Sequence, residues 1–154
     1  MRKFMVVAAA LMLVVAMAGM AMAAGNQTVA VSATVTGVCQ FLTGGSIAFA
    51  LDPATGGDVN GTVVQPTFWC TRGTAYTITD DSGTHELAAG QPRMVHATSA
   101  TDFIPYSLTY TAGGTGTGRT ATLTMDITST VLSANYLNAL GGNYSDTVTL
   151  TINP

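Results

Sequence analysis

The chain has 154 residues, of which only 8% are charged, and its formal net charge is −3. A length of this order accommodates a single domain. The shortage of positive charge argues against binding of nucleic acid or of an anionic membrane surface, because both require a basic face.

The first 24 residues differ in composition from the rest of the chain. Two basic residues precede a continuous apolar run over 4–18, and Ala-Met-Ala at 21–23 is a small-x-small cleavage signal. This order predicts a secretory signal peptide over residues 1–24, cleaved after Ala23 or Ala24. The alternative is a transmembrane anchor, since the uncharged stretch is long enough to span a bilayer. The signal peptide is favoured because no cationic flank follows, and we expect no membrane insertion after cleavage.

Cleavage would leave about 130 residues, the size of one domain. Three arginines would then face eight acidic residues, so the net charge would be −5, and no lysine would remain. Thr and Gly are abundant in this part, which is typical of strands and turns.

The mature chain opens with a segment, residues 25–36, in which apolar and polar side chains alternate. Val29, Val31, Ala33 and Val35 share one face of this predicted strand. It is either the ordinary first strand of its own domain or, in its early part, a donor strand for another copy. A sandwich that lacks its final strand exposes a hydrophobic groove and an unpaired edge, which an extended segment of a neighbour can fill. Such a contact is head-to-tail and builds a fibre.

Further short strands follow, separated by turns that contain Gly, Asp and Pro. The alternation predicts strands over 46–51, 62–70, 75–79, 104–111, 121–127 and 147–152. Residues 113–118 are expected to be a flexible connection, and 133–140 to hold one helical turn or an irregular loop. Seven or eight short strands predict an all-β, immunoglobulin-like antiparallel sandwich over residues 37–154.

The two cysteines of the mature chain are Cys39 and Cys70. In an exported protein such a pair is expected to form a disulfide. A metal site or a reactive thiol is the alternative, but no histidine lies nearby in the sequence.

The sequence offers little for catalysis, so we expect no enzyme and no cofactor. His85 follows Asp80 and Asp81 and precedes Glu86, which indicates a polar turn, with metal binding as the alternative. His96 is expected to be a strand residue. Trp69 is interpreted as a packing residue, with sugar stacking as a further possibility.

Four stretches carry a family resemblance. The alternating segment is followed closely by Cys39, and an apolar strand leads into Asp52-Pro53. The second cysteine opens a Cys-Thr-Arg-Gly-Thr-Ala-Tyr stretch over 70–76, and 142–148 reads Gly-Asn-Tyr-Ser-Asp-Thr-Val. In this order, after a signal peptide, the stretches resemble the spore coat protein U family, which includes the subunits of archaic chaperone–usher pili. The chain departs from the family at Ala50, where Gly is frequent, and at its Asn153-Pro154 ending.

The resemblance implies a secreted pilin that polymerises by donor-strand complementation into an extracellular surface fibre for adhesion or biofilm formation. The expected partners are identical or related pilin subunits, a periplasmic chaperone and an outer-membrane usher. Val29, Val31, Ala33 and Val35 would then fill the groove of a neighbour. Val148, Leu150 and Ile152 would line the edge of the groove, and the Cys39–Cys70 disulfide would pin the first strand to the sandwich.

Two other functions remain open at the level of the sequence. One is a self-contained secreted binding module, and the other is a spore-coat or cell-coat protein. A small secreted enzyme is the weakest alternative, because no catalytic constellation is recognisable.

Overall fold

The computed structural model describes residues 25–154, so the predicted signal peptide lies outside the described residues. The chain divides into two units, Met1–Thr34 and Val35–Pro154, and each is described by itself. Residues 25–38 form neither helix nor strand, and the first strand begins at Cys39. The alternating segment therefore forms no strand of its own in the single chain.

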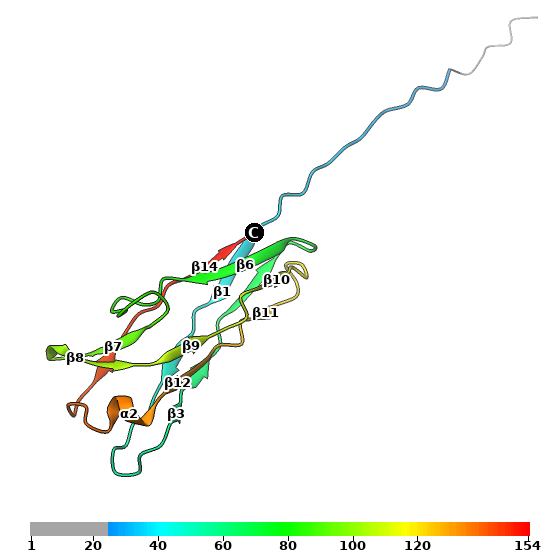
Figure 1. Cartoon of the computed structure of the whole chain (residues 1–154). Helices are drawn as coiled ribbons and strands as arrows, with labels where there is room; N and C mark the ends of the chain where they lie inside the picture. The colour runs from blue at the N-terminus through cyan, green and yellow to red at the C-terminus, as the bar shows by residue number, and fades with distance from the viewer. Residues whose placement is uncertain (1–24) are drawn as a thin grey trace, which may run out of the picture. The chain divides into compact units, whose positions relative to one another are not determined.

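The unit Val35–Pro154 consists of fourteen short strands and one helical turn, α2 (Ser133–Tyr136) (Figure 1). The strands are β1 (Cys39–Thr43), β2 (Ser46–Ala48), β3 (Val59–Asn60), β4 (Thr62–Val64), β5 (Thr67–Cys70), β6 (Ala75–Asp80), β7 (Arg93–His96), β8 (Ser99–Pro105), β9 (Ser107–Thr109), β10 (Gly113–Thr115), β11 (Leu123–Thr124), β12 (Thr128–Val131), β13 (Tyr144–Ser145) and β14 (Leu150–Asn153). Every strand pair is antiparallel. The predicted all-β antiparallel sandwich is thus confirmed.

The strands form five small sheets. Their orders are β10-β6-β14, β13-β7-β8, β1-β5-β11, β2-β4 and β3-β12-β9. Two core clusters hold them together as layers. The first joins β5 to β6, where Phe68 and Tyr76 pack edge to face with ring centroids 5.2 Å apart. The second joins β8, β12 and α2 through Ile104, Val131 and Tyr136, each at most 2% exposed.

Two of the predicted strands are each broken into two. The strand expected over 62–70 divides at Gln65-Pro66, because a proline has no backbone N–H to donate to a ladder. The strand expected over 104–111 divides at Tyr106, where the chain passes from the sheet of β7 to that of β12. Alternation alone does not reveal such a change of sheet, since its period of two continues through the break.

The prediction of a flexible connection over residues 113–118 is wrong for its first half. Residues 113–115 form β10, which pairs with β6. A Cβ atom at Gly114 would lie 2.7 Å from the hydroxyl of Tyr76, and one at Gly113 would lie 2.7 Å from the Tyr76 carbonyl oxygen. The glycines are needed here for close approach to the neighbouring strand.

Candidate functional site: a groove between two strand edges

Two strand edges of the sandwich have no partner strand along their outer side. β14 pairs only with β6, and β1 pairs only with β5, so both lie at the edges of their sheets. β13 and β2 continue these two edges, since each also pairs with a single strand. Within the described part of the chain, the outer edges of β1, β2, β13 and β14 therefore have backbone groups without a partner strand.

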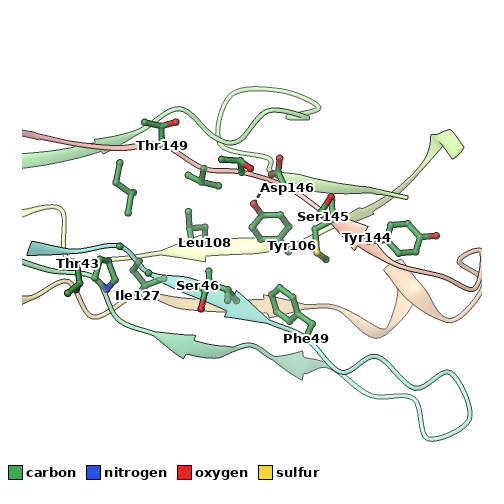
Figure 2. Close-up of a pocket in the computed structure, with 18 of the residues that line it drawn as sticks. Thr43, Ser46, Phe49, Tyr106, Leu108, Ile127, Tyr144, Ser145, Asp146 and Thr149 are labelled. Atoms are coloured by element: carbon green, nitrogen blue, oxygen red, sulfur yellow. Dashed lines mark hydrogen bonds between the residues drawn. The ribbon is translucent and has the colours of Figure 1, made fainter. Parts of the chain in front are cut away.

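A groove of about 760 Å³ lies between these edges (Figure 2). One wall comes from the first strands and the other from residues 144–150. Tyr106 and Leu108 lie between the two walls in Figure 2, and Ile127 also lines the groove. The apolar and aromatic side chains that line it are Phe41, Ile47, Phe49, Pro66, Met94, Tyr106, Leu108, Ile127, Tyr144, Val148 and Leu150. An apolar groove of this size beside unpaired edges suits an extended peptide with apolar side chains at alternate positions.

The C-terminal wall directs its free backbone groups toward the groove. The carbonyl oxygens of Thr147 and Thr149 accept hydrogen bonds from the backbone N–H groups of Thr84 and Asp81, at 3.1 and 3.2 Å. Successive residues of a strand direct their N–H and C=O groups to opposite sides. Those of Val148 and Leu150 therefore face the open edge, available to a further strand.

The opposite wall shows the same pattern. The backbone N–H of Thr71 donates to the Val38 carbonyl oxygen at 2.8 Å, and the next residue pair, Cys39 and Cys70, has its Cα atoms 4.1 Å apart. This close spacing is typical of a pair without hydrogen bonds between its backbone groups. The N–H and C=O of Cys39, and of Phe41 two residues later, thus face away from β5 and toward the unpaired side.

One residue of the groove lining, Asp146, has a buried carboxylate. The side chain of Asp146 is 2% exposed. It accepts hydrogen bonds from the Tyr106 hydroxyl at 2.8 Å and from the backbone N–H of Thr84 at 3.1 Å. The Nδ1 atom of His85 lies 3.3 Å from the same carboxylate. Burial raises the pKa of Tyr106 well above its ordinary value. The hydrogen bond to Asp146 and the negative charge of Asp146 also raise this pKa.

The disulfide predicted between the two cysteines is confirmed, and it joins Cys39 of β1 to Cys70 of the central strand β5. Leu150 and Ile152 lie in β14, half-buried against the first core cluster, whereas Val148 lies two residues before the strand. Leu150 and Val148 line the groove, but Ile152 does not.

The residues predicted as a donor strand are exposed where the structure describes them. Val29, Val31 and Val35 are 85%, 90% and 81% exposed. Their donor role is a prediction that the single chain does not test. The sequence reasoning missed most of the groove floor, namely Phe41, Phe49, Tyr106 and Leu108. Phe41 lies outside the strands predicted from the sequence, and the alternation that predicted Tyr106 and Leu108 as strand residues could not show that one strand was missing above them.

The polar residues considered for chemistry form no metal site. Among residues 25–154, no three His, Cys, Asp or Glu side chains come together in a way that could hold an ion. His96 is a strand residue of β7, 7% exposed, and its ring packs edge to face on Tyr144 with centroids 4.9 Å apart. Trp69 is half-buried in β5, with the guanidinium of Arg119 5.6 Å from its ring centre. Across the described residues, no helix has the length and apolar character needed to cross a membrane.

Comparison with known proteins gives a family match and a distant structural likeness. The sequence model of the Spore Coat Protein U domain matches residues 25–151. No curated protein sequence matches the chain. One similar solved structure is the complex of CsuC with CsuE, a chaperone and a tip adhesion subunit from the archaic chaperone–usher Csu pili of Acinetobacter baumannii. It is 17% identical with a TM-score of 0.48, and the match covers 77% of this chain and 40% of that one.

Proposed function

The chain belongs to the Spore Coat Protein U domain family, and on that basis we propose that it is a structural subunit of a secreted bacterial surface fibre. Subunits would join by donor-strand complementation, in which the N-terminal segment of one copy occupies the groove of the next. The fibre would serve adhesion or biofilm formation. A periplasmic chaperone and an outer-membrane usher would be the partners during assembly of what becomes an extracellular pilus.

The observation that carries this proposal is the fit between the groove and the N-terminal segment. The groove is apolar, and both of its walls present unpaired backbone groups. The segment offers Val29, Val31, Ala33 and Val35 at alternate positions, with exposed valines that need burial. This apolar set spans seven residues, 29–35, and the C-terminal wall of the groove, residues 144–150, is equally long. A strand in the groove would bury the apolar side chains and extend both ladders at once.

The same feature supports a chaperone partner. A free subunit would carry an apolar groove and two open strand edges, which are templates for uncontrolled pairing and aggregation. A partner that lends a strand before assembly would protect the groove. Exchange of that strand for the N-terminal segment of another subunit would then release the partner and lengthen the fibre.

The first test is gel electrophoresis without boiling. The mature chain, exported together with its chaperone, is compared with a version that lacks residues 25–33. We expect the full mature chain to give a ladder of SDS-resistant oligomers and the deletion to remove it, because only the deleted segment can join one copy to the next. If both versions run as the same folded monomer, the proposal fails and a self-contained binding module becomes the better explanation.

A further inference from the structure

Two ends of the sandwich carry opposite charges. The exit end, where the N-terminal segment joins β1, consists of residues 36–39, 71–74 and 116–120. It carries the exposed side chains of Arg72 and Arg119, and its loops contain no acidic residue. Arg119 lies over the ring of Trp69, beside the start of β1. These are two of the three arginines in the described chain, which otherwise is acidic.

The far end of the groove, beyond Phe49, is acidic. Here residues 52–58 and α2 hold one another in place, because the backbone N–H of Ser133 donates to Asp58 at 2.8 Å and the Tyr136 hydroxyl donates to the Gly57 carbonyl oxygen at 2.8 Å. Asp52 and Asp58 are both exposed. Figure 1 shows α2 and the loop before β3 at the opposite end of the sandwich from the start of β1 and the end of β14. We call this surface the receiving end.

Exposed apolar side chains accompany the acidic residues at the receiving end. Leu132, Leu137 and Leu140 flank or follow α2 and are 53%, 41% and 50% exposed. At the exit end, Val38 is 45% exposed. Both ends thus combine charge with apolar surface, which is the composition of an interaction surface with a specific partner.

The segment between the donor residues and the sandwich is short and held in place. Val38 donates its N–H to the Thr71 hydroxyl at 3.1 Å, and that hydroxyl lies 3.4 Å from the carbonyl oxygen of Thr36. Only three residues separate Val35 from Cys39. Four Cα steps span at most about 14 Å, so a copy whose Val35 lies in a groove must have its exit end against the end of that groove.

Two arrangements are then possible for the donor. In the first, the sandwich of the donor copy lies beside the Cys39 end of the acceptor's groove. The exit ends of the two copies then meet, and arginines face arginines. In the second, the sandwich of the donor copy lies beside Phe49 and Tyr144 of the acceptor. The exit end of the donor then meets the receiving end of the acceptor, and Arg72 and Arg119 face Asp52 and Asp58. We propose that this second contact forms between successive copies of the chain, and that its charge complementarity selects an open head-to-tail polymer over a closed pair. The inference rests on the proposed donor-strand function.

The test compares the rate of ladder formation between charge variants of the full mature chain. R72E/R119E should assemble roughly tenfold more slowly than the unaltered chain at low salt, because complementary charge accelerates encounter. The difference should shrink at high salt, where charges are screened. The variant R72E/R119E/D52R/D58R reverses both ends, keeps the original net charge, and should regain the original rate. Circular dichroism of each variant checks that the sandwich is folded.

Three outcomes bear on the inference. Slower assembly that the fourfold variant restores supports it. An unchanged rate for R72E/R119E overturns it, and so does slower assembly that the fourfold variant fails to restore. A synthetic peptide of residues 25–36 has no exit end, so its binding to the full chain tests the groove alone. If the peptide does not bind, the donor-strand function fails; if it binds every variant equally while ladder rates are unaffected, only the contact between the ends is refuted.

Discussion

Val31 occupies the middle of the alternating N-terminal segment, and its side chain is 90% exposed in the single chain. We expect Val31→Asp to abolish the SDS-resistant ladder, because a carboxylate would have to enter an apolar groove without a partner, at a cost of several kcal/mol. The fold should be unaffected, since residues 25–38 belong to no strand.

Ser32→Asp is the matched control for this substitution. It adds the same charge one residue later, on the opposite face of the alternating segment, and should assemble. Circular dichroism and unboiled gels of both variants provide the measurement. A ladder from Val31→Asp, or its loss in both variants, would contradict the assignment of faces.

Tyr110 provides a prediction about alkaline pH. Its hydroxyl donates a hydrogen bond to the Asp80 carboxylate, and partial burial together with this bond and charge raises the pKa of Tyr110 from 10.0 to about 12. A raised folded-state pKa means that the contribution to stability is complete below pH 10 and is lost as the pH rises toward 12. As the pH is raised, we expect part of the near-ultraviolet absorbance of tyrosinate to appear only above pH 10 in the folded chain. Tyr110→Phe should remove a group that titrates within this window. A Tyr110 that titrates at its ordinary pH would disprove the contribution of Asp80.

At the scale of single elements, Gln65 lies in the break between β4 and β5 and hydrogen-bonds across it to the backbone of Ile127. Its side-chain amide donates to the Ile127 carbonyl oxygen at 2.8 Å, and its carbonyl oxygen accepts from the Ile127 N–H at 2.7 Å. The side chain thus gives the backbone of Ile127 the two hydrogen bonds that a neighbouring strand would otherwise supply. The backbone of Ile127, a core residue 5% exposed, depends on this one amide.

Gln65→Leu should destabilise the chain by about 1–3 kcal/mol, because both backbone groups of Ile127 would lose their partner. The stability of Gln65→Glu should lie between that of Gln65→Leu and that of the unaltered chain. A carboxylate accepts a hydrogen bond from the Ile127 N–H but has no proton to donate to the Ile127 carbonyl oxygen. Urea unfolding of the three chains gives the comparison. Equal stability of Gln65→Leu and the unaltered chain would show that water satisfies Ile127 instead.

The sequence predicted elements best where one strand stays in one sheet. β6 was predicted nearly to its ends, because Tyr76 and Ile78 alternate with exposed threonines and both enter the first core cluster. β10 was not predicted, because a glycine carries no side chain whose periodicity could reveal a strand. For residues 133–136 the sequence allows either a helical turn or a loop, since four residues are too few for a helical pattern.

For the whole molecule, the layer architecture and the disulfide could be predicted from the sequence, and so could the presence of a groove, whereas most of the residues that line the groove could not. Alternating strands and a pair of cysteines in a chain predicted to be exported are local features. The groove arises because residues 41–49 and 144–150, about a hundred positions apart, lie at two edges that do not pair with each other. Only the pairing of the strands shows which edges remain open.

The disulfide also determines how the sandwich responds to a pulling force on its N-terminal segment. Such a load reaches β1 at Cys39, and β1 alone is an edge strand that could peel away from its neighbour one hydrogen bond at a time. The covalent bond transmits the load directly to Cys70, in the middle strand of the same sheet, whose side chain is fully buried in the core. Tension thereby passes to the middle strand and the packed interior, and the hydrogen bonds between β1 and β5 carry little of it.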